Sequence, residues 1–226
     1  MPGRYFLFSS TETVSAHFGV EIAAPFPPRY NIAPTQPVAL IRQGMRGREF
    51  ALARWDFLPG WAKKPNEKPQ INARSESVSE KPFFRSAFKR RRCLIPANGF
   101  YEWVGEKTPK RAFCFRPAGV ALFAFAGVWE TAVDPDGGEI DTVAILTTDP
   151  GPDIRPIHNR SGVIIPPEGY GRWLEADERD VEGLSDLFAP QPAGFWRVYE
   201  VSAAVSNIRN DGPELTEPLP TQQSLL

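Results

Sequence analysis

Short runs of β-branched and aromatic residues, most of them bounded by Gly, Pro or Asp, recur along this chain and constrain its fold more than any other feature. Such runs predict strands, because branched and aromatic side chains suit a pleated sheet and the bounding residues favour turns. They do not alternate strictly with long helical segments, which disfavours a parallel sheet. The predicted strands cover residues 38–42, 49–57, 93–97, 112–116, 120–129, 142–147, 162–165 and 196–202.

Helical patterns are fewer than strand patterns. One runs from Thr11, a candidate N-cap, to Gly19, which favours a helix end. Another places phenylalanines on one face at helical spacing, after a proline in the first turn. The predicted helices cover residues 11–19, 81–91, 167–176 and 181–188.

These elements predict an α+β fold: a single β-rich domain with a mostly antiparallel, barrel-like sheet and a few flanking helices. No internal repeat divides the chain. Residues 213–226, which contain three prolines and many polar side chains, are predicted to form a flexible tail. The domain is therefore expected to span residues 1–212.

Composition excludes several classes of protein. The two cysteines and two histidines are too few and too widely separated for a disulfide framework or a structural zinc site. No glycine-rich phosphate loop or dinucleotide fingerprint occurs, so we expect neither a metal nor a cofactor. The longest apolar run, residues 120–129, is too short to span a membrane, and the first residues do not resemble a signal peptide. We expect a cytoplasmic protein.

Charge is distributed unevenly between the two halves of the chain. Residues 1–92 hold 16 Lys and Arg against 7 Asp and Glu, a formal charge of +9, whereas residues 93–226 have a formal charge of −10. This asymmetry indicates either contact with a polyanion or two halves that interleave and neutralise each other. The densest basic run, Arg85 to Arg92, fits a solvated helix face as readily as a phosphate-binding patch.

Several segments are more polar than a pure scaffold requires. Asn72, Arg74 and Glu76 lie within five residues, and Glu102 stands between aromatic residues, where low polarity raises the pKa of a carboxyl and makes it a proton donor near neutrality. His158 follows a Pro-Ile pair. Taken singly, each has a plain structural explanation: a paired carboxylate, a satisfied histidine, or simple packing for an aromatic such as Trp61.

Taken in order, these segments resemble the SOS response-associated peptidase (SRAP) family, the abasic-site processing proteins that shield damaged single-stranded DNA. The resemblance covers about residues 1–212. The matching features are Gly3-Arg4-Tyr5, Arg29-Tyr30-Asn31 with Ala33-Pro34, Trp55 through Gly60-Trp61, Asn72-Ala73-Arg74, Gly99-Phe100-Tyr101-Glu102-Trp103, Thr147, Ile157-His158 with Arg160, and Val201-Ser202 followed by Val205, Asn207 and Asn210.

The resemblance implies a single β-rich domain and a chemistry based on the amino terminus. In the family, removal of the first methionine exposes a cysteine whose amine and thiol capture the ring-opened aldehyde of an abasic site as a thiazolidine. The assisting residues correspond here to Asn72, Glu102 and His158. The implied DNA-binding residues are Arg4, Arg74 and Arg160 at phosphates, Trp61 and Trp103 near unstacked bases, and Thr147.

The chain departs from the family pattern at two places. Position 2 is Pro2 instead of cysteine, which removes the thiol and therefore the thiazolidine. After His158 and Arg160, where the family usually has Met-Pro, this chain has Ser161-Gly162.

Pro2 still permits chemistry at an aldehyde once Met1 is removed. An α-amine titrates near pH ~7.7–8.0, so a fraction is neutral and nucleophilic at physiological pH. A secondary amine forms a cationic iminium, an electron sink that favours β-elimination of the 3′ phosphate.

We therefore expect a monomer that acts on abasic single-stranded DNA, with catalytic residues Pro2, Asn72, Glu102 and His158. Self-directed removal of Met1 is part of this expectation. The sequence leaves open two alternatives: a protein that binds such DNA without covalent capture, and a peptidase.

Overall fold

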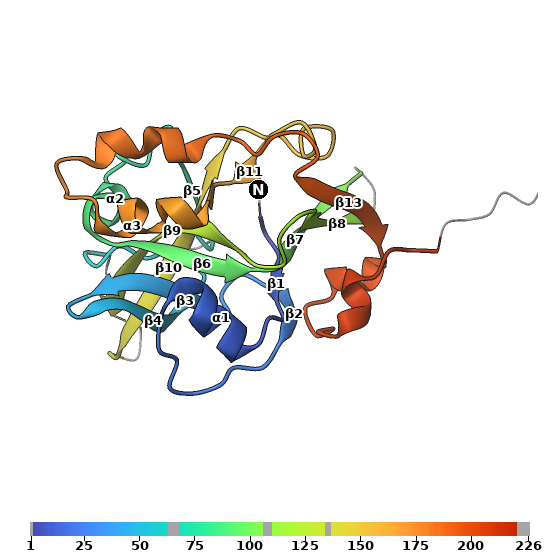
Figure 1. Cartoon of the computed structure of the whole chain (residues 1–226), viewed down its shortest axis with the longest axis horizontal. Helices are drawn as coiled ribbons and strands as arrows, with labels where there is room; N and C mark the ends of the chain where they lie inside the picture. Colours follow the sequence, from blue (N-terminus) through green and yellow to red (C-terminus); the bar gives the residue numbers. More distant parts are fainter. Residues whose placement is uncertain (1, 63–67, 106–109, 134–136, 221–226) are drawn as a thin grey trace, which may run out of the picture.

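Five strands close into a barrel in the computed structural model, which describes residues 2–62, 68–105, 110–133 and 137–220 (Figure 1). The strands pair in the order β10, β4, β3, β6 and β9, and β9 pairs again with β10, which closes the ring. Only the pairing of β10 with β4 is parallel within this ring. The barrel strands are β3 (Pro37–Gly44), β4 (Gly47–Arg54), β6 (Arg92–Ala97), β9 (Phe123–Val133) and β10 (Glu139–Thr148).

A second, antiparallel sheet stands beside the barrel, with the strand order β13, β8, β7, β1 and β2 (Figure 1). The chain passes from barrel strand β6 into β7 through Asn98, which is buried and accepts hydrogen bonds from the N–H groups of Phe8 and Ser9. This junction joins the barrel to the strand that carries the amino terminus. The strands are β1 (Tyr5–Leu7), β2 (Arg29–Ile32), β7 (Gly99–Val104), β8 (Arg111–Pro117) and β13 (Trp196–Val201).

Three short strands extend β9 and β10 beyond the closed ring. β5 runs parallel to β10 and β11 antiparallel to it, so that Arg74 and Gly162 both pair with Thr147. The segment that leads into β1 lies beside this region (Figure 1). The short strands are β5 (Asn72–Arg74), β11 (Ser161–Gly162) and β12 (Ile164–Ile165).

The predicted fold class is confirmed: the structure is a β-rich α+β fold around a mostly antiparallel barrel. All eight predicted strands are present, although residues 162–165 are shared between β11 and β12. The sequence analysis missed β1, β2, β5 and β7. β5 and β7 coincide with polar segments that were singled out for their chemistry, and β1 and β2 overlap motifs of the family resemblance.

The first predicted helix forms with nearly the predicted bounds. The hydroxyl of Ser10, not that of Thr11, caps it by accepting a hydrogen bond from the Thr13 N–H, and Gly19 ends it in the left-handed conformation. α1 covers the barrel near β3 (Figure 1), and it contacts α3, because the Phe18 ring stacks on the Tyr170 ring at 5.3 Å between ring centres. The α-helices are α1 (Thr11–Phe18), α2 (Arg85–Arg90) and α3 (Tyr170–Glu175), and the 3₁₀ helices are η1 (Pro167–Gly169), η2 (Val181–Phe188), η3 (Ala203–Ser206) and η4 (Pro213–Thr216).

Two predicted helices differ from their expectation. The helix predicted over residues 81–91 begins only at Arg85, where Phe84 offers no side-chain cap. The segment 181–188 is a 3₁₀ helix, and Gly183 within it weakens the α-helical preference.

The first part of the predicted flexible tail packs against the domain. Residues 213–216 form η4, in which Leu215 is buried against Tyr101, Val201 and their neighbours. The Leu219 N–H donates to the Glu200 carbonyl oxygen, which ties the segment to β13. Leu215 supplies the apolar anchor that the proline-rich composition obscured. Residues 221–226 lie outside the described residues.

The two oppositely charged halves of the chain interleave. Arg42 pairs with Asp141 at 2.7 Å, and Arg91 pairs with Glu130 at 3.0 Å. Within the basic run, Arg90 pairs with Glu178, and Arg92 is buried with its guanidinium donating to backbone carbonyl oxygens. Three of the basic residues in the run from Arg85 to Arg92, namely Arg90, Arg91 and Arg92, therefore make contacts within the protein.

Both cysteines are buried and free. Burial raises the pKa of Cys114 to about 12, which leaves its thiol protonated and unreactive at neutral pH. The described residues contain no cluster of three or more His, Cys, Asp or Glu that could hold a metal ion. No helix in the described part of the chain is long and apolar enough to cross a membrane.

Candidate active site

Pro2 is buried where the amino-terminal segment enters the fold. The Asn72 side chain, on β5, donates a hydrogen bond from Nδ2 to the Pro2 carbonyl oxygen at 3.1 Å. The Asn72 Oδ1 atom is also buried and has no hydrogen-bond partner among the described residues. Asn72 therefore fixes the second residue of the chain and presents an unused acceptor beside it.

Glu102 lies on β7, next to the amino-terminal strand. The antiparallel register pairs Tyr5 with Phe100, and the Tyr101 N–H donates to the Arg4 carbonyl oxygen, so continuing this register places Gly3 opposite Glu102. Only 5% of Glu102 is exposed. Burial raises the pKa of Glu102 to about 7, against the opposing influence of the positively charged amino terminus. The carboxyl can therefore both donate and accept a proton near neutrality.

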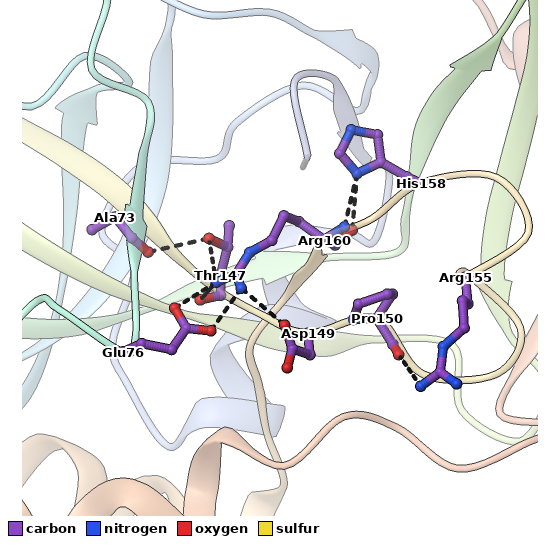
Figure 2. A network of polar contacts seen from close by, with 8 residues as sticks. All are labelled: Ala73, Glu76, Thr147, Asp149, Pro150, Arg155, His158 and Arg160. Atoms are coloured by element: carbon purple, nitrogen blue, oxygen red, sulfur yellow. Dashed lines mark hydrogen bonds and ion pairs between the residues drawn. The ribbon is translucent and has the colours of Figure 1, made fainter.

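His158 lies in the loop between β10 and β11. Its Nδ1 atom accepts a hydrogen bond from the Arg160 N–H at 3.0 Å (Figure 2). The same Nδ1 atom lies 3.2 Å from the Arg160 carbonyl oxygen, so its role as donor or acceptor depends on the tautomer of the ring. Burial lowers the pKa of His158, the charge of the amino terminus acts in the same direction, and the backbone contact with Arg160 opposes them. The lowered pKa favours the neutral imidazole near pH 7.

Arg160 links the loop of His158 to the strand of Asn72 (Figure 2). Its guanidinium donates to both carboxylate oxygens of Glu76, at 2.6 and 2.8 Å, and to Asp149 at 3.2 Å. It also donates to the Thr147 carbonyl oxygen at 2.6 Å. The Arg160 side chain is 13% exposed, so its charge is already matched inside the protein.

Thr147, which was predicted as a DNA contact, is buried at the end of β10. Its side chain is fully buried, and its hydroxyl donates to the Ala73 carbonyl oxygen while its backbone oxygen accepts from Arg160 (Figure 2). Thr147 therefore connects β10 to β5. The family resemblance placed Thr147 in the site, and the structure shows that it is buried between two strands.

Arg4 and Trp103 support each other beside the second sheet. The Arg4 guanidinium lies 5.5 Å from the centre of the Trp103 ring and donates to Asn31 Oδ1 at 2.7 Å and to the Val205 carbonyl oxygen at 2.8 Å. The Trp103 indole N–H donates to the Ser206 hydroxyl at 3.0 Å. Both residues thus tie the amino-terminal strand and β7 to the segment around η3.

Arg74 and Trp61 are the two predicted DNA contacts that face solvent. Arg74 is exposed at the end of β5, two residues after Asn72. Trp61 is 68% exposed, and its ring meets the Phe83 ring edge-on at 6.3 Å between ring centres. A cation and an indole in this state suit a phosphate and an unstacked base, respectively.

The four predicted catalytic residues come from four separate parts of the chain: Asn72 contacts Pro2, and the strand register places Glu102 opposite Gly3. His158 is linked to them through the charge of the amino terminus, which lowers its pKa. The sequence analysis missed several supporting residues. Glu76 stood in the segment 70–76, and its spacing from Asn72 gave no sign of its pairing with Arg160. Asn31 and Gly162 were noted in motifs, but nothing in the sequence connected them to Arg4 or Pro2.

The fold and the site define a β-barrel protein in which the second residue, Pro2, is buried beside polar side chains. The chain belongs to the SOS response associated peptidase (SRAP) family, whose model matches residues 1–208. It is 36% identical over 225 residues to the abasic site processing protein YoqW of Bacillus subtilis, covering 96% of this chain and 99% of that protein. It is 30% identical over 194 residues to the abasic site processing protein YedK of Escherichia coli, covering 84% and 85% of the two chains.

Solved structures share this fold. A crystal structure of a protein from Bordetella bronchiseptica matches with a TM-score of 0.77 at 28% identity, over 88% of this chain and 99% of that one. A crystal structure from Bacteroides thetaiotaomicron matches with a TM-score of 0.82 over 96% of this chain and 99% of that one. At 19% identity the second match shows the fold alone.

Proposed function

We propose that this protein binds abasic sites in single-stranded DNA and reacts with their aldehyde through the amine of Pro2. The observation that carries the proposal is the position of Pro2, whose carbonyl oxygen accepts a hydrogen bond from Asn72 and whose neighbour Gly3 lies opposite Glu102 in the strand register. The family membership and the names of the relatives supply the substrate class.

Removal of Met1 is required for this chemistry. While the Met1–Pro2 bond is intact, the Pro2 nitrogen is a tertiary amide and has no reactive lone pair. After removal it is a secondary amine, the nucleophile of the proposed reaction. A carboxyl with a pKa of about 7 and a neutral imidazole are suited to assist hydrolysis of that bond, so we include self-directed removal of Met1 in the proposal.

The reaction begins when the neutral Pro2 amine adds to C1′ of the ring-opened sugar. Protonated Glu102 supplies the proton that lets the C1′ hydroxyl leave as water, and a cationic iminium remains. Loss of a C2′ proton to the Glu102 carboxylate gives an enamine, and the C3′–O bond then breaks with departure of the phosphate. Hydrolysis of the remaining iminium returns the free amine. His158 Nε2–H donates to the sugar oxygen while these steps proceed.

DNA binding is assigned to the residues that face solvent. Arg74 contacts a backbone phosphate next to the reacting sugar, and Trp61 stacks on an unpaired base. Arg4, Trp103 and Arg160, which are held by internal contacts, shape the site around the sugar. The buried Asn72 Oδ1 accepts a hydrogen bond from the protonated amine or from a sugar hydroxyl.

The decisive experiment traps the iminium with borohydride on an abasic single-stranded oligonucleotide. Intact mass first establishes that Met1 is absent. Wild type is expected to form an adduct that depends on the reductant, and Pro2→Ala is expected to form it more slowly. Glu102→Gln is expected to form it about 100-fold more slowly than wild type, which is typical for loss of a general acid. Pro2→Cys, which supplies a thiol, is the positive control. Glu130→Gln, at a buried carboxylate with a raised pKa on β9, is the matched control and keeps the wild-type rate.

Two results would overturn the mechanism. One is no trapped adduct from Met1-free wild-type protein under conditions in which Pro2→Cys is captured. The other is an equal rate from wild type and Pro2→Ala. Retained binding of the oligonucleotide in either case would leave the second candidate, a protein that binds abasic DNA without covalent capture.

A further inference from the structure

Gly162 is packed against Pro2, the residue on which the proposed function depends. A Cβ atom added to Gly162 would lie 3.1 Å from the Pro2 Cγ atom and 2.5 and 2.6 Å from two ring carbons of Phe125. Gly162 is buried and its φ angle does not fall in the left-handed region, so its backbone conformation does not require glycine. The surrounding space requires it.

Of the groups around Gly162, Pro2 is the least restrained. The Phe125 ring is fully buried against the rings of Tyr5, Phe100 and Phe123. Gly162 itself is paired with Thr147 in the sheet. Pro2 lies outside the strands and is held through its carbonyl by Asn72. A side chain at position 162 would therefore displace Pro2 more readily than Phe125.

We infer that Gly162, with Phe125 behind it, determines which amino-terminal residue the site accepts, because the missing side chain leaves the space that the pyrrolidine ring of Pro2 occupies. Gly162 is a positioning residue: it acts through Pro2 and contributes no reacting atom. The ring contact lies on Cγ, two bonds from the nitrogen, so that a shift of the ring moves the nucleophile. The two departures of this chain from the family pattern, at position 2 and at positions 161–162, are therefore in contact with each other through Pro2 and Gly162.

The inference rests on the proposed function for its catalytic consequence, since displacement of the ring alters the rate only if the Pro2 amine reacts. Positional errors of about 1 Å at a reacting group can cost on the order of 100-fold in rate. A shift of a few tenths of an ångström at Pro2 is expected to cost about 10-fold.

The test is a double-mutant cycle of Gly162→Ala and Pro2→Ala in Met1-free protein, which isolates the contact between the two positions. Borohydride trapping on the abasic oligonucleotide gives the rate, and thermal unfolding without DNA gives the stability. Gly162→Ala is expected to slow trapping about 10-fold when Pro2 is present and less than about 2-fold in the Pro2→Ala background. Gly169→Ala is the matched control: its added Cβ would lie 3.1 Å from Ile165 and 3.2 Å from Leu187, and it is expected to act equally in both backgrounds.

Thermal unfolding separates this inference from the proposed function. If no protein forms an adduct but Gly162→Ala lowers the Tm less in the Pro2→Ala background than in wild type, the contact is supported and the proposed function fails. Equal effects of Gly162→Ala in both backgrounds, on rate and on Tm, would overturn the inference. The glycine would then be required only by its packing against Phe125. If Gly162→Ala does not fold, the same cycle is measured in a Phe125→Leu background, which removes the closest clash. Equal effects of Gly162→Ala with Pro2 and with Pro2→Ala would again overturn the inference.

Discussion

The raised pKa of Glu102 predicts that the site costs the protein stability at neutral and alkaline pH. The carboxyl has an ordinary pKa of 4.5 in the unfolded chain and about 7 in the folded protein. Between these values the folded state binds the proton more strongly, so stability falls as the pH rises through this range and levels off above pH 7. A difference of about 2.5 in pKa corresponds to about 3 kcal/mol of unfolding free energy at pH 8.

Glu102→Gln removes the ionisation and keeps a similar shape, so it should recover this free energy. We expect the variant to exceed wild type by less than about 1 kcal/mol at pH 5 and by about 3 kcal/mol at pH 8, while losing the trapping activity. With a urea m-value of about 3 kcal/mol/M, the difference is a shift of about 1 M in the midpoint. Urea denaturation at intervals between pH 5 and 8.5 measures it.

The control is Glu200→Gln, at a surface carboxylate paired with Arg111, which should keep the pH dependence of wild type. The reasoning is refuted if Glu102→Gln is no more stable than wild type at pH 8, or if the difference between the two is constant from pH 5 to pH 8. Either result would mean that Glu102 is not destabilised in its ionised form by burial.

Three further predictions concern the supports of the site. Asn98→Ala leaves two part-buried N–H groups without their acceptor and should cost about 3 kcal/mol, a fall in Tm of about 6–12 °C. A fall below about 2 °C would contradict the role of this junction. Arg74→Ala should weaken binding of abasic single-stranded DNA and reduce the slope of log K against log salt by about 0.7, and an unchanged slope would exclude a phosphate contact. Arg160→Lys should leave that slope unchanged, because Glu76 and Asp149 already match the charge of Arg160. It should slow borohydride trapping about 10-fold, because it loosens the loop of His158. A reduced slope with normal trapping would instead make Arg160 a phosphate contact.

The missed strands show where the sequence stopped being informative. β5 and β7 carry Asn72 and Glu102, whose polar side chains break the apolar alternation by which strands are recognised. Their pairing comes from neighbours: β5 lies on β10 through residues 72–74, and β7 lies between β1 and β8. A polar catalytic residue inside a strand therefore weakens the sequence pattern by which the strand is predicted. The strand forms because of its pairing with strands distant in the sequence.

The roles of the arginines were also beyond the sequence. Arg4, Arg74 and Arg160 carry the same side chain, yet Arg74 is exposed while Arg160 is clamped by Glu76 and Asp149. An arginine contacts phosphate or protein according to the carboxylates that the fold brings within reach. Those partners lie 84 and 11 residues from Arg160, separations that no local pattern encodes.

By itself the sequence determined the barrel-forming strands and the fold class, because hydrophobic periodicity is a local property, and the family resemblance supplied the residues proposed to react with an aldehyde. Tertiary structure decided the rest. The closing of β9 on β10 and the junction at Asn98 bring Pro2, Asn72, Glu102 and Gly162 together from distant parts of the chain. Burial in that arrangement, and no property of the isolated residue, raises the pKa of Glu102 to about 7 and excludes Thr147 from the surface.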